Sequence, residues 1–235
     1  MTDTMTNVSI VNKEVLDTLN EFKDLWYKDL ESFKKHVYLI NGNHSKNKRE
    51  ENISDAYKKK IMADYKNHDG YPEYIHAYTF KQVKTSKYWD RTPRSDDDKI
   101  KEKYFNDNYI RLNKKLSSIL STRANALAAV YPPGGYIGWH NNANAPSYNI
   151  IFTWSETGDG YWKHVDPKTG EEVLVKDEVG WQAKAFYFGS YEDGPDHLVY
   201  HMASTDCWRF TVSYIFDQTN KSFWEDVLEE IGMND

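Results

Sequence analysis

The feature that most constrains the fold is the uneven distribution of turn-forming residues. Residues 126–217 contain nine of the 12 glycines and five of the 7 prolines in this 235-residue chain. They separate short apolar or alternating runs, which is the pattern of antiparallel strands joined by tight turns. Eight strands are predicted, at residues 125–131, 136–140, 148–155, 161–165, 171–175, 181–188, 197–202 and 208–216.

Eight strands at this spacing favour a closed or double-sheet antiparallel architecture, a jelly roll or a barrel. The first half differs, because its apolar residues recur at the 3.6-residue period of a helix. Helices are predicted after Asn12, a suitable N-cap, over residues 53–66 and around residues 105–119. Residues 67–98 are predicted to be irregular, with the acidic run at 95–98 as a solvated loop.

A last helix is predicted from the capping box formed by Ser222 and Glu225. The predicted fold class is therefore α+β with a mainly β core. Residues 1–124 form a mainly helical region packed on that core, residues 125–217 form the core itself, and residues 218–235 carry the short C-terminal helix.

Composition excludes several classes of protein. The single cysteine, Cys207, rules out a disulfide scaffold and a cysteine-rich zinc module. No apolar run approaches the roughly 20 residues that a membrane span needs, and the N-terminal residues lack the pattern of a secretory signal. We expect a cytoplasmic protein with no membrane partner.

The last predicted strand pair carries chemically useful side chains. A hairpin centred on Thr205 places His201 opposite Arg209, with Thr211 on the same face as Arg209. The other face of the last strand is aromatic and aliphatic. This pattern predicts a polar pocket inside a barrel with helices packed outside, although a polar face exposed to water would produce the same alternation.

A second segment, residues 131–152, contains a tight turn and a strand that ends in His140, with Asn142 two residues later. Imidazole suits iron, copper, nickel and zinc, and two histidines with one oxygen ligand are typical of non-haem Fe(II) oxygenases. His197 is an alternative second imidazole, because it lies four residues before His201 and would share its face.

Residues 125–217 resemble the Fe(II)- and 2-oxoglutarate-dependent dioxygenases, in particular the prolyl-hydroxylase-like branch; residues 1–125 match nothing that we can name. The resemblance implies a double-stranded β-helix, a jelly-roll or cupin-like fold. The residues that carry it are Tyr131-Pro132, Tyr136, His140-x-Asn142, His201, Arg209-x-Thr211 and the closing strand at 210–216.

The resemblance also implies roles for individual residues. His140 and His201 would bind Fe(II), and Arg209, helped by Thr211, would bind the distal carboxylate of 2-oxoglutarate. A guanidinium suits that role because it binds a carboxylate bidentately and stays charged. Tyr131 and, more weakly, Tyr148 are candidates to hydrogen-bond the co-substrate. Dioxygen would be the second co-substrate, and ascorbate is a further candidate cofactor.

The sequence departs from the family where the usual pattern is His-x-Asp or His-x-Glu, because it has Asn142. Three interpretations stay open. The amide oxygen of Asn142 is a metal ligand, a nearby carboxylate such as Glu156 or Asp166 reaches the metal instead, or the site is degenerate and inactive. Halogenating relatives have Ala or Gly at this position, and Asn would obstruct the halide.

The leading hypothesis is an oxygenase that hydroxylates a C–H bond of a protein side chain, a small molecule or a nucleobase. The alternative is a catalytically inactive cupin-like module that binds 2-oxoglutarate or a metal, and a zinc hydrolase is a third interpretation. Residues 57–109 interleave aromatic with basic residues, a pattern seen in single-strand binders. A sequence pI of about 5.8 argues against nucleic acid, and a tyrosine-rich helical cover with solvated lysines is the favoured interpretation of the pattern.

Overall fold

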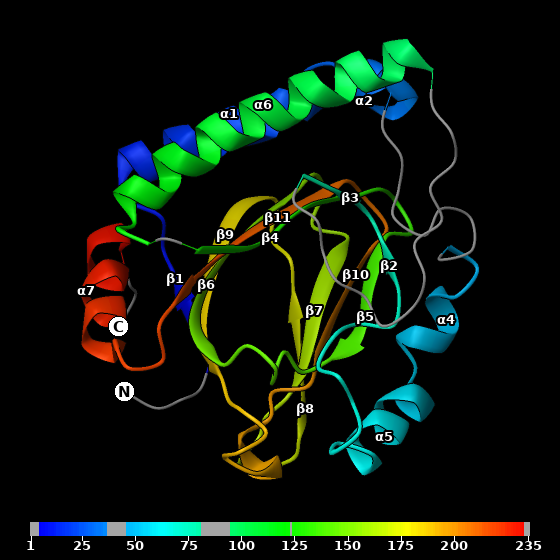
Figure 1. Cartoon of the computed structure of the whole chain (residues 1–235), viewed down its shortest axis with the longest axis vertical. Coiled ribbons are helices and arrows are strands. Elements are labelled where there is room, and N and C mark those ends of the chain that lie inside the picture. Colours follow the sequence, from blue (N-terminus) through cyan, green and yellow to red (C-terminus); the bar gives the residue numbers. More distant parts are fainter. Residues whose placement is uncertain (1–4, 37–45, 81–94, 123, 233–235) are drawn as a thin grey trace.

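The computed structural model describes residues 5–36, 46–80, 95–122 and 124–232. This part of the chain is α+β, with six α-helices and two antiparallel sheets, one of six strands and one of five. The sheets face each other across an interior, and the helices lie outside them (Figure 1). The predicted class, α+β with a mainly β core, is confirmed at this level of detail.

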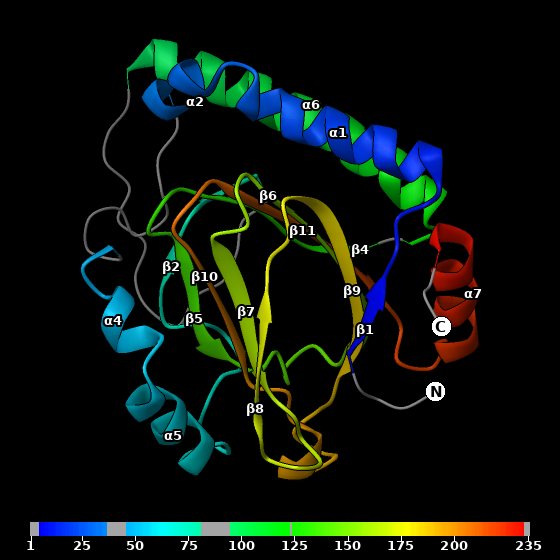
Figure 2. The same ribbon diagram turned by 180° about the vertical axis from the view of Figure 1, so that it is seen from behind.

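The helices divide into three groups by position. Two long helices and a short one cover the six-stranded sheet, two short helices lie beside the five-stranded sheet, and the last helix follows the final strand (Figures 1 and 2). In chain order they are α1 Lys13–Tyr27, α2 Leu30–His36, α4 Arg49–Asn52, α5 Asp55–Ala63, α6 Asp96–Ile119 and α7 Lys221–Ile231.

The strands form two sheets with the orders β1-β9-β6-β11-β4-β3 and β2-β5-β10-β7-β8. From β4 onward the chain passes from one sheet to the other at every step except the β7–β8 hairpin. The strands are β1 Thr6–Val8, β2 Ile75–His76, β3 Tyr78–Thr79, β4 Ala124–Tyr131, β5 Tyr136–His140, β6 Ser147–Ser155, β7 Gly160–Val165, β8 Glu172–Lys176, β9 Gly180–Phe188, β10 His201–Thr205 and β11 Arg209–Phe216.

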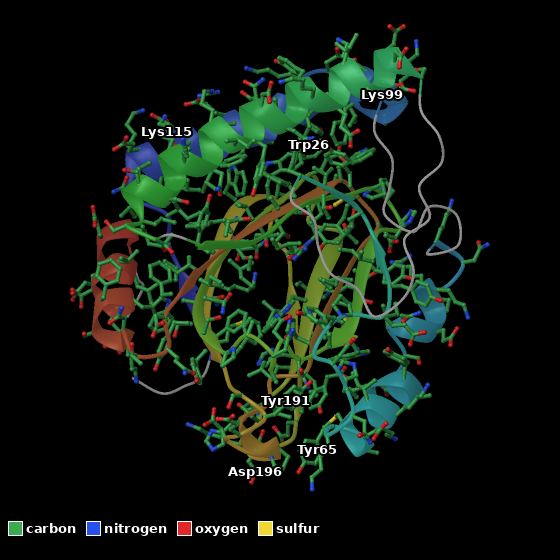
Figure 3. The ribbon with its side chains drawn as sticks, in the orientation of Figure 1. Trp26, Tyr65, Lys99, Lys115, Tyr191 and Asp196 are labelled. Carbon is green, nitrogen blue, oxygen red and sulfur yellow. The ribbon has the colours of Figure 1, made fainter. Side chains whose placement is uncertain are left out.

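The main hydrophobic core lies between the six-stranded sheet and the α1/α6 layer. Phe22 and Trp26 of α1 and Phe210 of β11 are all fully buried there, with the Trp26 and Phe210 rings 6.0 Å apart. Figure 3 shows Trp26 between the helices and the sheet, whereas Lys115 lies on the solvent-facing side of α6. The predicted apolar face of the last strand is confirmed: it packs against helices.

Local signals explain where the helices begin. The side chain of Asn12 accepts hydrogen bonds from the backbone N–H groups of Glu14 and Val15, as expected of an N-cap. Ser95 does the same for α6 through the N–H of Asp98. The prediction of a solvated loop at 95–98 was therefore wrong, because this acidic run is the first turn of a helix, where negative charge is favourable.

Two other boundaries also differ from the prediction. Helix α7 begins at Lys221 with Asn220 in the N-cap position, so Ser222 lies inside the helix and the predicted capping box does not form. The predicted strand at 197–202 is a 3₁₀ turn, Pro195–His197, followed by extended chain, and β10 begins only at His201. Among the described helices, none has the combination of length and apolar character that crossing a bilayer would take.

Candidate metal and anion site

The two predicted imidazoles lie side by side. His140 ends β5 and His201 begins β10, and they are direct partners in the antiparallel pairing of these strands. Their ring centroids are 4.1 Å apart, and both residues are buried, with exposures of 3% and 5%. Positions about sixty residues apart in the chain thus form one pair of nitrogen donors inside the protein.

Both rings are held in the same way by the backbone. His140 Nδ1 lies 2.8 Å from the carbonyl oxygen of Gly138, and His201 Nδ1 lies 2.8 Å from that of Val199. Because a carbonyl can only accept, each Nδ1 carries the proton and each Nε2 keeps a lone pair. Metal-binding histidines characteristically have this arrangement, in which a backbone acceptor fixes the tautomer.

Burial also favours the uncharged form of both rings. It lowers the pKa of His140 to about 4, and it lowers the pKa of His201 well below its usual value, an effect reinforced by the neighbouring His140. Both imidazoles are therefore neutral near pH 7, which is the protonation state that binds a metal.

A β-bulge aims His140 into the interior. His201 pairs with His140 while Ala203 pairs with Ile137, so two residues of β5, Gly138 and Trp139, lie opposite one residue of β10. Strict alternation would place Ile137 and His140 on opposite faces. The extra residue brings both into the same cavity lining and leaves Trp139 in a cluster on the outer face of the sheet.

Asn142 lines the same cavity as the two imidazoles and lies next to His201. Its Nδ2 lies 3.4 Å from His201 Nε2, and half a turn of the amide would present Oδ1 there instead. The residue has a φ of 56°, a conformation that asparagine tolerates better than most residues. Its backbone N–H donates to the carbonyl of Gly70 at 3.0 Å, which fixes this turn.

The segment around Asn142 is anchored at the end of the two-sheet core that lies away from α1 and α6 (Figure 3). The hydroxyl of Tyr191 donates to the carbonyl of His68 and lies 3.2 Å from Asn141 Oδ1. Figure 3 shows Tyr191 at this end, with Tyr65 and Asp196 beside it.

Arg209 approaches the same cavity from the opposite sheet, which corrects one prediction. β10 and β11 do not form a hairpin: His201 pairs with His140 and His164 in the five-stranded sheet, whereas Arg209 pairs with Tyr131 and Ser155 in the six-stranded sheet. The two polar faces meet across the interior and not along one sheet. His201 and Arg209 do line one cavity, but the predicted pairing of their strands was wrong.

The Arg209 guanidinium is buried among polar and aromatic groups. Its Nη1 donates to Thr211 Oγ1 at 2.8 Å, and its Nε donates to Asp177 Oδ2 at 2.7 Å. The ring of Tyr131 lies 5.6 Å from its central carbon, within the range of a cation–π contact. These partners hold the guanidinium in place, and the structure gives no protein hydrogen bond, within the described residues, to its other N–H groups.

A cavity of about 360 Å³ joins the imidazole pair to Arg209. This volume is at the lower end of the range for small-molecule sites. Arg209 is the only residue of its lining, among the residues described, with a permanently charged side chain. The lining includes His140, Asn142 and His201, the cluster Tyr131, Arg209, Thr211 and Ser213, and apolar walls from Leu127, Ile137, Ile151, Trp162, Phe188 and Ile215.

The two tyrosines suggested for co-substrate binding are in different places. Tyr131 is buried and lines the cavity next to Arg209, and burial raises its pKa to about 12. Tyr148 lies on the outer face of β6, where its ring is 4.7 Å from Tyr187 and 4.8 Å from Trp224. The prediction for Tyr148 was wrong, because its alternation puts Ser147 and Asn149 into the cavity instead.

Three alternative ligands lie away from the imidazole pair. His197 is exposed in the 3₁₀ turn. Glu156 accepts hydrogen bonds from the Tyr27 hydroxyl and the Trp208 N–H, and Asp166 accepts from the backbone of the β7–β8 turn. Within the described residues, no group of three His, Cys, Asp or Glu side chains could hold a metal.

The aromatic and basic segment at 57–109 does not present one stacking surface in its described parts. Tyr57 and Tyr74 are buried, and Tyr57 packs with Ile61 and Trp139 under α5. Residues 81–94, which include Lys84, Trp89, Arg91 and Arg94, lie outside the described residues. Tyr57 and Tyr74 therefore serve as packing, which suits the cover interpretation, whereas Tyr104 is exposed.

Sequence reasoning missed several residues of this interior. Asp177, which follows β8, binds Arg209, and Phe188 stacks on His201 at 4.6 Å. His164 neighbours His201 in the sheet and is buried. Asp177 lies in an acidic stretch, KDE, that looks like any polar turn, so nothing local could have identified it.

Comparison with known proteins yields only distant similarities. No protein-family model matches the sequence, and no curated protein is similar to it. A Pseudomonas putida prolyl-4-hydroxylase structure is 12% identical over 92% of both chains, with a TM-score of 0.42. A Trichoplax adhaerens prolyl hydroxylase, solved with a hypoxia inducible factor peptide fragment, is 10% identical over 87% of this chain and 94% of that chain, with a TM-score of 0.33. Similarities this loose carry no argument about function, which therefore rests on the site.

Proposed function

We propose that the chain is an Fe(II)- and 2-oxoglutarate-dependent oxygenase that hydroxylates a C–H bond of its substrate. The observation that carries the proposal is the pair of neutral, backbone-oriented imidazoles that share one small cavity with a buried arginine. A donor pair alone would suit many metals. A fixed guanidinium in another part of the same cavity, paired on one side with Asp177, adds a site for an anionic co-ligand.

The donor set fits Fe(II). His140 and His201 each direct Nε2 away from the backbone acceptor that holds Nδ1, and Asn142 can offer an amide oxygen after rotation. Two imidazoles with one oxygen and open positions suit non-haem Fe(II). The neutral amide is a weaker donor than a carboxylate, so we expect modest metal affinity.

The anion site suits the distal carboxylate of 2-oxoglutarate. After its bonds to Asp177 and Thr211, Arg209 keeps N–H groups that have no protein acceptor among the described residues, and Tyr131 covers one face of the guanidinium. The proposed roles are thus metal binding for His140, Asn142 and His201, and co-substrate binding for Arg209, Thr211 and Tyr131.

We further propose that the two sheets form a double-stranded β-helix. What supports this is the chain path, since β4, β6, β9 and β11 belong to one sheet and β5, β7, β8 and β10 to the other. Consecutive strands on opposite sides wind around one interior, which is how a jelly roll encloses a site.

Dioxygen is the oxidant of the proposed hydroxylation. Bound Fe(II) would supply dioxygen activation, in which 2-oxoglutarate becomes succinate and CO₂ while the second oxygen atom replaces a substrate C–H with C–OH. The protein's residues orient the co-substrate through Arg209 and Thr211 and restrict water through the apolar walls. Asn144 and Tyr71 lie in the lining near the Asn142 turn, and we propose that substrate enters beside them.

Succinate formation tests the proposal. The purified chain is incubated with Fe(II), 2-oxoglutarate and ascorbate, and succinate is measured against a reaction without dioxygen. We expect oxygen-dependent succinate, lost in Arg209→Ala and retained in Glu156→Gln, which alters a carboxylate outside the cavity. Absence of succinate under every condition, together with absence of 2-oxoglutarate binding, would contradict the proposal.

Asn142 favours a second candidate, an inactive cupin-like module that binds 2-oxoglutarate or a metal without turnover. Its amide lies against His201 Nε2, the atom a metal would take, and no acidic side chain lines the cavity within the described residues. This candidate predicts 2-oxoglutarate binding by calorimetry with no succinate across candidate substrates.

A further inference from the structure

Asp177 is a buried carboxylate that the proposed reaction does not yet use. It follows β8, and its side chain is fully buried while that of Arg209 is 4% exposed. Its Oδ2 accepts from Arg209 Nε at 2.7 Å, yet Oδ1 has no hydrogen-bond partner within the described residues. A buried carboxylate that is only half satisfied is costly, and such pairs are weak evidence for stability.

The fold is built to keep this carboxylate behind Arg209. The backbone N–H of Asp177 donates to the carbonyl of Gly160 at 2.9 Å. Gly160 has no Cβ, and a Cβ there would overlap Asp177 Oδ2. The neighbouring Thr205 would also be within 3.1 Å of that Cβ. Position 160, at the start of β7, therefore favours glycine, because the side chain of Asp177 occupies the space that a Cβ would need.

The position of Asp177 is notable because few acidic side chains among the described residues lie near the cavity. Where the resemblance leads one to expect a carboxylate, position 142 has a neutral amide, and no cavity-lining residue in the described part is acidic. Asp177 is the acid that touches Arg209, outside the lining itself. Lys184 is a second buried cation in the same interior, with its Nζ donating to Gln182 Oε1 at 2.6 Å.

We propose that Asp177 is a positioning residue of the anion site: it orients Arg209 and supplies the negative charge that position 142 lacks. This inference rests on the proposed function, because it concerns the distal carboxylate of 2-oxoglutarate. Asp177 accepts from Nε and Thr211 accepts from Nη1, and the remaining N–H groups, which have no protein acceptor in the part of the chain that the structure describes, are left for the ligand. Asp177 also offsets the charge of Arg209, so the site binds its anion less tightly than a lone arginine would.

The negative charge of Asp177 predicts whether each of two substitutions raises or lowers the affinity for a keto acid. Asp177→Asn keeps an acceptor for Nε and removes one negative charge, so the distal carboxylate binds more tightly. Asn142→Asp adds a negative charge beside the metal site, so any keto acid binds less tightly. One charge at about 10 Å in a protein interior corresponds to roughly a tenfold change in affinity.

Calorimetry with the Mn²⁺-loaded protein tests the inference. The ligands are 2-oxoglutarate and pyruvate, which shares the keto-acid end but lacks the distal carboxylate. We expect Asp177→Asn to bind 2-oxoglutarate about tenfold more tightly and to raise the affinity for pyruvate, whose charge lies farther from residue 177, by a clearly smaller factor. In Asn142→Asp both ligands should bind about tenfold less tightly, and the double variant should bind 2-oxoglutarate with nearly wild-type affinity. Glu156→Gln is the matched carboxylate-to-amide control and should change nothing.

Each outcome decides one claim. The inference is overturned, and the proposed function stands, if the wild type binds and converts 2-oxoglutarate but Asp177→Asn does not bind 2-oxoglutarate more tightly. The same holds if Asp177→Asn raises the affinity for pyruvate by the same factor as the affinity for 2-oxoglutarate. If the wild type binds no 2-oxoglutarate, both fail. Should Asp177→Asn not fold, Asn142→Asp decides: unchanged 2-oxoglutarate affinity in that variant overturns the charge argument.

Discussion

The two faces of strand β11 have opposite environments. Phe210, Val212 and Tyr214 point outward, are fully buried, and pack against the helical layer. Arg209 and Thr211 alternate with them and line the cavity. Burial of each large side chain on the outer face stabilises the fold by about 1.5–3 kcal/mol. The inner face instead buries polar groups, which need hydrogen-bond partners. Stability and binding chemistry are thus assigned to alternate residues of one strand.

The largest expected effect is on the outer face. Phe210→Ala should lower the free energy of unfolding by about 3–5 kcal/mol, because it opens a cavity among the rings of Phe22, Trp26 and Phe80. Urea unfolding at neutral pH measures this loss. Metal affinity per folded molecule should stay within twofold, and a selective loss of metal binding would break the division between the two faces.

The next effect belongs to the inner imidazoles. His201→Ala should reduce Fe(II) affinity more than a hundredfold, about 2.7 kcal/mol, while the protein still unfolds cooperatively. Calorimetry under anaerobic conditions measures the affinity, and circular dichroism checks the fold. The exposed His197 provides the matched control as His197→Ala. If iron stays bound stoichiometrically to His201→Ala, the assignment of that ligand is wrong.

Lys184 gives a pH test of the interior. Burial lowers its pKa from 10.5 to about 8, with Asp177 and Glu178 acting to raise it and Arg209 to lower it further. Because the unfolded chain holds this proton to higher pH than the folded protein does, stability rises with pH between about 8 and 10.5.

The gain between pH 7.5 and 9.5 should be about 2 kcal/mol and should disappear in Lys184→Met. Urea midpoints at the two pH values measure it, with the difference between the proteins removing the contribution of other groups. An equal pH dependence in both proteins would mean that Lys184 is not the titrating group.

The smallest effect sharpens the role of position 142. Asn142→Asp should preserve or raise Fe(II) affinity, by up to about tenfold or 1.4 kcal/mol, because it supplies a negative oxygen donor. Aspartate also tolerates the positive φ of this residue. Calorimetry measures the affinity, with Asn144→Asp as a neighbouring control. A collapse of metal binding would place residue 142 outside the ligand sphere.

Much of the architecture could be predicted because its signals are local. The turn-forming glycines and prolines indicate where the strands end, and β5 was predicted with the bounds that it has in the structure. The alternation of apolar and polar residues predicted the two faces of β11. The boundaries that failed, at Ser95, Ser222 and His197, depend on which of several polar residues caps a helix or continues a strand. Such choices differ by about 1 kcal/mol and are settled by packing.

The site was predictable in part for the same reason. His140, His201 and Arg209 stand out as a histidine and arginine pattern on predicted strands, and they do line one cavity. Tyr148 was only a weaker candidate implied by the resemblance, and the alternation of β6 places it on the outer face, against Tyr187 and Trp224. Asp177 was missed because its partner is 32 residues away in the chain.

The amino-acid sequence by itself determined the β-rich second half, the helical cover and which residue types are available for chemistry. Only the tertiary structure decided which sheet each strand joins, that a bulge in β5 turns His140 inward, and that Asp177 meets Arg209. The physical reason is range: turns, caps and alternation are interactions between near neighbours, whereas register and strand pairing depend on the packing of the whole chain.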